Sequence, residues 1–215
     1  MSRIMMPVDN FFRSARRWPK RIAVEILESD RVQKITYADL AEAVNALAAG
    51  LQAIDPETQS RIGICAYNNY EHLLAWLAAY AAGKVWVPLN PRNGSEELDR
   101  IIALTEPSII FFDGNCSDKF GAAEAALIGA KKNDKTDRPS VWISDLIARH
   151  RGEEPKRHRL GPDDLQAIKF TGGSSGVPKG VMQSYRVFNS CIATMLVSYE
   201  FDSQDRHLIA APMTH

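Results

Sequence analysis

Short apolar segments of the kind that form buried strands alternate with longer segments of helical pattern along most of this chain. The strand-like segments include residues 61–67, 84–89 and 108–112, and each interval between them is long enough for a helix. Such an alternation favours parallel β-α-β units, because two parallel strands need a long crossover connection. The crossover helices then cover the sheet. The sequence therefore predicts an α/β fold with a parallel sheet and flanking helices.

Helical periodicity and capping residues predict the helices. Leu40, Val44 and Leu47 recur at helical spacing behind Thr36, and Asp39 stands at the capping-box distance from that threonine. This pattern predicts a helix over residues 37–53. On similar grounds, the other predicted helices cover residues 69–82, 95–106, 118–130 and 185–199, and the other predicted strands cover 141–143, 165–171 and 208–211.

The amino-terminal segment, residues 1–21, holds six basic residues and lacks the continuous apolar stretch of a secretory signal. Its basic, acid-poor character resembles an organelle transit peptide. An amphipathic first helix, with Phe11, Phe12 and Ala15 facing inward, is favoured instead, because runs of charge usually mark a solvated face.

A charged stretch that contains glycine and proline divides the chain. Residues 151–164 hold too few apolar side chains to order as a core element, so we expect an exposed linker there. We predict a first α/β subdomain over residues 1–150, a linker over 151–164, and the beginning of a second subdomain over 165–215. A length of 215 residues fits one large domain or two small ones.

Charge and composition argue against several classes of binding partner and site for this chain. The 26 basic and 26 acidic residues balance, which argues against a nucleic-acid or anionic-membrane partner. The longest apolar run, residues 73–82, is too short to span a bilayer, so no transmembrane segment is expected. Three separated cysteines suggest reduced thiols and a cytoplasmic protein. The histidines lack the spacing of metal ligands, so we expect no zinc site.

One glycine-rich segment, residues 171–180, has the composition of a phosphate-binding loop. Glycines leave backbone N–H groups unobstructed, so that successive amides can converge on an anion. The hydroxyls add donors, and Lys179 adds a mobile positive charge suited to phosphate oxygens. The residues with these roles are Thr171, Gly172, Gly173, Ser174, Ser175, Gly176 and Lys179.

Two other phosphate loops and a flexible linker are the alternatives for this segment. The Gly-x-x-x-x-Gly-Lys-Ser/Thr pattern fails because Val177 follows Gly176, and Gly-x-Gly-x-x-Gly fails on its spacing. A flexible glycine-serine linker would have polar flanks. Here an apolar strand precedes the segment, and Val181, Met182 and a predicted helix follow it. These packed flanks favour phosphate binding.

The string Phe170-Thr-Gly-Gly-Ser-Ser-Gly-Val-Pro-Lys-Gly180 closely resembles the phosphate-loop signature of the adenylate-forming superfamily, which includes acyl-CoA synthetases, luciferases and peptide-synthetase adenylation domains. Residues 62–98 resemble the early β-α-β-α stretch of that family. The block Ala211-Pro212-Met213-Thr214-His215 resembles its next signature. The resemblance covers nearly the whole chain, but it corresponds to the amino-terminal portion of a family member.

The resemblance implies a reaction and its cofactors. A member joins a carboxylic acid to ATP, giving an acyl-adenylate and pyrophosphate, and passes the acyl group to a thiol, most often coenzyme A. The substrate carboxylate is itself the nucleophile. The loop residues, with Lys179, would hold the β- and γ-phosphates together with Mg²⁺, and His215 would line the acyl pocket; a terminal, solvated His215 without a role is equally compatible.

The sequence departs from the family in two ways. Tyr185 follows Ser184 where members usually carry histidine, a position without a catalytic role. More importantly, members are more than twice as long, and the adenine-binding segments, the acidic Mg²⁺ residue, the hinge and the domain with the catalytic lysine have no counterpart here. We therefore expect a fragment without catalytic residues that is inactive alone. Another branch of the superfamily and a non-catalytic nucleotide-binding module are the alternatives. The acid and the oligomeric state stay open.

Overall fold

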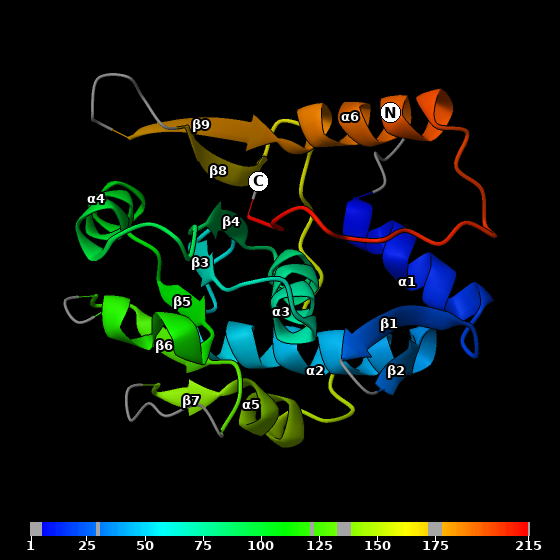
Figure 1. Ribbon diagram of the computed structural model, residues 1–215, viewed down its shortest axis with the longest axis horizontal. Coiled ribbons are helices and arrows are strands. Elements are labelled where there is room, and N and C mark those ends of the chain that lie inside the picture. The colour runs from blue at the N-terminus through cyan, green and yellow to red at the C-terminus, as the bar shows by residue number, and fades with distance from the viewer. Residues whose placement is uncertain (1–5, 29–30, 121–122, 133–138, 172–177, 215) are drawn as a thin grey trace.

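The computed structural model describes residues 6–28, 31–120, 123–132, 139–171 and 178–214 (Figure 1). Its centre is a seven-stranded sheet in the order β7-β6-β5-β3-β4-β8-β9, with a separate two-stranded sheet, β1-β2. All neighbours in the large sheet are parallel except β8 and β9. The strands are β3 (Arg61–Cys65), β4 (Val85–Pro88), β5 (Ile109–Phe112), β6 (Ala126–Gly129), β7 (Val141–Trp142), β8 (Leu165–Thr171) and β9 (Lys179–Ser184). The predicted α/β class is confirmed.

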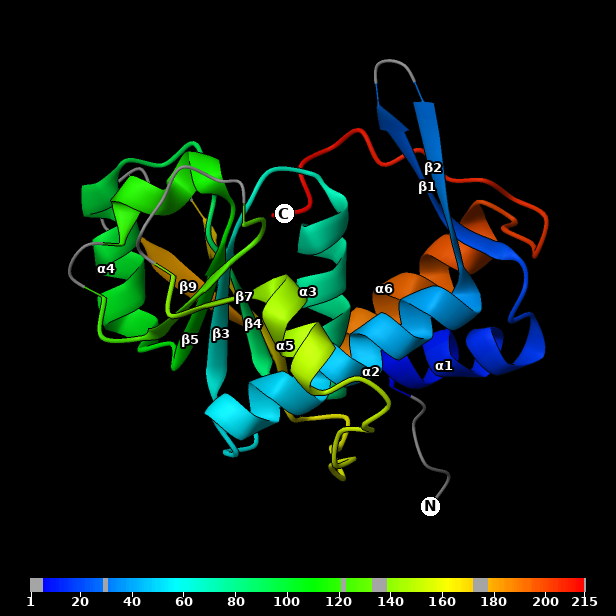
Figure 2. The same cartoon turned by 90° about the horizontal axis from the view of Figure 1, so that it is seen from below.

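Helices cover both faces of this sheet. The helices are α1 (Pro7–Arg17), α2 (Tyr37–Ile54), α3 (Tyr70–Ala81), α4 (Ser95–Thr105), α5 (Ile143–Arg149) and α6 (Tyr185–Ser198). Figure 2 shows α4 on one side of the sheet and α2, α3 and α5 on the other. The core divides accordingly: Ile64 and Trp86 pack on the side of α2 and α3, whereas Cys65 and Val87 pack on the side of α4. Adjacent residues of one strand thus fill opposite cores, as the pleat requires.

Local signals placed most helices correctly. The Thr36 hydroxyl accepts a hydrogen bond from the Asp39 N–H (3.2 Å), which caps the first turn of α2. Asn69 caps α3 in the same way, accepting from the His72 N–H (2.7 Å). In α1, Phe12 and Ala15 are buried and Phe11 packs against the core from a partly buried position, so the predicted inward face is confirmed.

The prediction of a helix over residues 118–130 is wrong. A 3₁₀ helix, η1 (Gly114–Lys119), precedes the strand β6 there. The alanines of this segment have high helix propensity, but residues 126–129 pair in parallel with residues 109–112 of β5. The sheet thereby gains a neighbour for β5, and such tertiary pairing overrides a weak local preference.

Four further strand assignments differ from the sequence-based expectation. Residues 208–211 form no strand, and Leu208 and Ile209 are exposed there without a strand partner among the described residues. The antiparallel pair β1 (Ile22–Glu28) and β2 (Arg31–Thr36) was not predicted. Nor was β9, which pairs antiparallel to β8.

The division into two subdomains stays a prediction. The strands β8 and β9 extend the same sheet as β3 and β4, through the Trp86–Ala167 pair. The predicted linker, residues 151–164, is tied to α2 and to the loop after it. The His158 ring lies 2.7 Å from the Thr58 hydroxyl and 3.1 Å from the Gln52 amide nitrogen, so the linker is solvated in part and anchored in part.

A buried lysine joins the amino ends of three strands. The Lys84 side chain is 1% exposed, and its Nζ donates to the carbonyl oxygens of Asp55 (2.6 Å) and Glu57 (2.7 Å) and to the Ser60 hydroxyl (2.8 Å). It also forms an ion pair with the Asp55 carboxylate (3.1 Å). That carboxylate accepts hydrogen bonds from the hydroxyls of Ser60 and Ser108. The end of α2 and the starts of β3, β4 and β5 thus meet in one polar cluster.

This cluster should make the stability of the fold depend on pH. Burial alone would raise the pKa of the Asp55 carboxyl, but hydrogen bonds from Ser108 and Ser60, with those from the Glu57 N–H and Lys84, outweigh burial and hold the pKa far below its usual range. A carboxyl with a depressed folded-state pKa stabilises the fold above its unfolded pKa of about 3.9, and that stability is lost as the pH falls. We expect the free energy of unfolding in urea to fall from about pH 5 downward, and Asp55→Asn to flatten that slope. An Asp55→Asn variant with the parent slope would contradict this assignment.

Candidate phosphate-binding site

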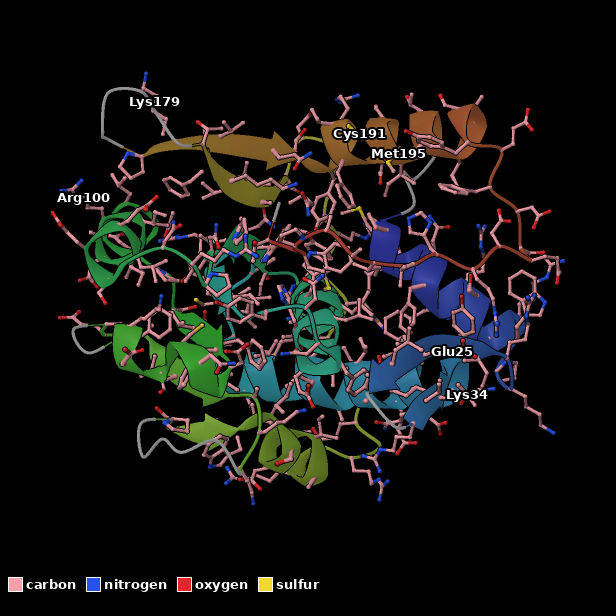
Figure 3. All side chains as sticks on the ribbon, in the orientation of Figure 1. Glu25, Lys34, Arg100, Lys179, Cys191 and Met195 are labelled. Atoms are coloured by element: carbon pink, nitrogen blue, oxygen red, sulfur yellow. The ribbon has the colours of Figure 1, made fainter. Side chains whose placement is uncertain are left out.

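The ends of the glycine-rich segment lie opposite each other at the last pair of a β-hairpin. Thr171 ends β8 and Lys179 begins β9, and these two residues are register partners. Both are exposed, and Figure 3 shows the Lys179 side chain pointing away from the sheet. The hydroxyl and the ammonium group therefore flank the connection between the strands, at the carboxyl end of the parallel strand β8.

The remaining predicted site residues lie outside the described residues. These are Gly172, Gly173, Ser174, Ser175 and Gly176 of the loop, and His215 of the predicted acyl pocket. Their roles stay predictions. Of the predicted set, the structure brings Thr171 and Lys179 together.

The hairpin connection lies at the carboxyl end of a parallel strand. In α/β proteins, ligands usually bind beyond the carboxyl ends of the parallel strands. The Asp113 carboxylate, buried at the end of β5, ties two of these ends together. It accepts hydrogen bonds from the Tyr67 N–H (2.8 Å), after β3, and from the Asn115 N–H (3.1 Å). The connections that follow β3 and β5 are therefore held together at this edge.

Residues 211–213 are bound to the same edge. The Asn68 amide nitrogen donates to the Ala211 carbonyl (2.7 Å), and the Met213 N–H donates to the Asn68 side-chain oxygen (2.8 Å). The side chain of Asn68 thus pairs with the backbone of 211–213 as a neighbouring strand would. Sequence patterns do not indicate this role of Asn68, because its partner is 143 residues away.

The chemistry of the described donors fits a phosphate group. A hydroxyl and an ammonium group supply neutral and charged hydrogen bonds to phosphate oxygens. In the described part of the chain, no group of three or more His, Cys, Asp or Glu residues is placed to bind a metal ion. Nor does any described helix have the length and apolar character needed to cross a membrane.

Comparison with known proteins identifies a matching family and several similar enzymes. The family profile of the AMP-binding enzyme matches residues 11–215. The feruloyl-CoA synthase of Amycolatopsis sp is 30% identical over 181 residues, which cover 84% of this chain and 34% of that protein. A phosphinothricin tripeptide synthetase of Streptomyces viridochromogenes is 28% identical over 185 residues, covering 82% of this chain and 15% of that protein.

Solved structures share the fold. A long-chain-fatty-acid-CoA ligase from Archaeoglobus fulgidus superposes with a TM-score of 0.83 at 18% identity, covering 100% of this chain and 43% of that one. The chain thus spans about a third of the feruloyl-CoA synthase and less than half of this ligase. The match to the family profile extends over nearly the whole sequence, and the chain belongs to the AMP-binding enzyme family.

Proposed function

We propose that this chain is the amino-terminal, phosphate-binding portion of an ATP-dependent acid–thiol ligase. The ligase would activate a carboxylic acid as its acyl-adenylate and transfer the acyl group to coenzyme A. The observation that carries this proposal is the register pair of Thr171 and Lys179, which flanks the glycine-rich connection at the carboxyl edge of the sheet. Membership of the AMP-binding family and the similarity to a feruloyl-CoA synthase support it.

In this proposal the hairpin binds the part of ATP that leaves as pyrophosphate. Lys179 and the Thr171 hydroxyl would bind the β- and γ-phosphates with the amides and hydroxyls of residues 172–176. Mg²⁺, which would share the phosphate charge, is assigned to no residue of this chain. Positioning of the acid and stabilisation of phosphate charge would then supply catalysis, because the acid is its own nucleophile.

A peptide-synthetase adenylation domain is the second candidate. The similarity to a phosphinothricin tripeptide synthetase favours it. Both candidates form an acyl-adenylate and differ in the thiol that accepts the acyl group: coenzyme A in the first, a carrier-protein thiol in the second. A trapped acyl-adenylate offered both thiols would distinguish them.

Carboxylate-dependent release of pyrophosphate from ATP and Mg²⁺ tests the proposal. We expect none from these 215 residues alone. We expect release when the chain replaces the matching segment of the Amycolatopsis feruloyl-CoA synthase, with ferulate as the acid. Turnover by the chain alone would contradict its assignment as a portion of the catalytic unit. A folded chimera that binds ferulate but neither binds ATP nor releases pyrophosphate would contradict the phosphate-binding role.

A further inference from the structure

Lys169 carries a charge that has no assigned role, either in stabilising the fold or in the phosphate loop. It lies on β8, two residues before Thr171, so both side chains stand on the same face of the strand. This face is turned toward α3 and α6, because Ala167, two residues earlier, belongs to the core on that side. The Lys169 ammonium lies 5.5 Å from the centre of the Trp86 ring.

The charge of Lys169 has no carboxylate partner in the part of the chain that the structure describes. Its side chain is half-buried, and burial lowers the pKa of its ammonium group. The neighbour that opposes this effect is the thiol of Cys191 on α6, which Figure 3 labels. Partial burial of an ammonium group without an anion is costly. The contact with the Trp86 ring offsets part of that cost, and an anionic ligand would offset more of it.

The buried indole group beside Lys169, that of Trp86, also lacks a partner for its N–H. Trp86 is 3% exposed, and its Nε1–H has no hydrogen-bond acceptor among the described residues. Trp76 on α3 packs against Trp86. The two rings meet edge to face, with their centres 5.9 Å apart. Buried polar groups are normally hydrogen-bonded, so an unpaired donor on a ring that contacts an unpaired cation indicates a site for an acceptor.

We propose that Lys169, Trp86 and Trp76 form a binding site for the carboxylate of the organic acid substrate. The ligand chemistry is that of an oxyanion carried on an apolar body. The aromatic rings of Trp76 and Phe188, whose centres are 6.5 Å apart, extend the apolar surface toward α6. One cation among aromatic walls fits a monocarboxylate better than a polyphosphate, which requires several charges and is provided for at Lys179.

The position of this site on the strand suits the proposed reaction, on which this inference rests. Two residues along a strand span about 7 Å. A carboxylate at Lys169 therefore lies farther along the strand than the outer phosphates bound at Thr171, on the side where the inner end of a nucleotide would lie. That is where an acid must stand to attack the α-phosphorus of a nucleotide whose outer phosphates occupy the loop.

The indole N–H resonances of this 215-residue chain test the proposal without catalysis. The four tryptophans give four such signals in a ¹H–¹⁵N spectrum, and Trp86→Phe identifies the one from Trp86. We expect sodium benzoate or sodium octanoate to shift the Trp86 signal. Lys169→Met, which keeps an apolar stem over the ring, should weaken that affinity at least tenfold, and Lys169→Arg should retain it. Lys34→Met, which removes an exposed charge elsewhere, is the matched control.

Three outcomes would overturn the proposal. The first is the absence of any indole shift with either carboxylate, and the second is a shift of unchanged affinity in Lys169→Met. The third is displacement of benzoate by inorganic pyrophosphate in competition, which would assign Lys169 to the phosphates. Pyrophosphate binding that leaves the carboxylate shift in place supports two separate sites. Because these measurements involve no turnover, failure here is distinguishable from failure of the chimera to release pyrophosphate.

Discussion

Replacement of Lys84 by methionine is expected to lower the free energy of unfolding by about 3–5 kcal/mol, the range for removing one partner of a buried ion pair. The ammonium group has four oxygen partners within 3.1 Å, and methionine can satisfy none of them. The variant would leave the carbonyls of Asp55 and Glu57 without their donor and the Asp55 carboxylate without its counter-ion. Urea unfolding at neutral pH measures the loss.

Lys34→Met is the matched control for Lys84→Met. Lys34 also pairs with a carboxylate, that of Glu25 (3.8 Å), but its side chain is 59% exposed, and Figure 3 shows both residues at the surface of the β1-β2 sheet. Exposed pairs contribute about 0–1 kcal/mol. Equal losses in the two variants would show that burial of Lys84 does not decide its contribution to stability.

The sequence was sufficient where structure depends on near neighbours. Residues 37–53 were predicted as a helix and α2 covers Tyr37–Ile54, because the cap at Thr36 and the apolar spacing behind it are local. The sequence was insufficient where pairing with another strand determines the secondary structure of a segment. The alanines before Gly129 favour a helix locally, yet β5 takes that segment as its parallel neighbour. Such pairing depends on residues far apart in sequence, which periodicity within one segment does not report.

The same division applies to the candidate site. The glycines, hydroxyls and Lys179 could be selected from the sequence, because a phosphate loop is a local composition. That Thr171 and Lys179 face each other could not, because it depends on the antiparallel pairing of β9, whose apolar residues Val181 and Met182 are too few to indicate a strand. The role of Lys169 depends on Trp86, which comes from another strand. Local patterns thus identify candidate residues, and the pairing of strands in the sheet determines which of these residues lie close together.

Lys179→Met is expected to weaken the binding of inorganic pyrophosphate to this chain by about 10-fold to 150-fold. A hydrogen bond to a charged group contributes about 1.5–3 kcal/mol, and each 1.4 kcal/mol is tenfold in affinity. Lys179 is exposed at the start of β9, and methionine removes its charge where the hairpin partner, Thr171, retains its hydroxyl. Calorimetric titration of the chain with pyrophosphate gives the two dissociation constants.

Arg100→Met separates a specific contact from a general loss of positive charge. Arg100 lies on α4, where its guanidinium pairs with Glu96 (2.5 Å), and Figure 3 shows it apart from the Lys179 side chain. Both variants lower the net charge of the chain by one unit, so a long-range electrostatic effect would weaken pyrophosphate binding similarly in both and would fade with added salt. A large loss confined to Lys179→Met is the result expected of an ammonium group in contact with phosphate oxygens. Equal losses would remove Lys179 from the site and leave the phosphates to the backbone amides and hydroxyls of the loop.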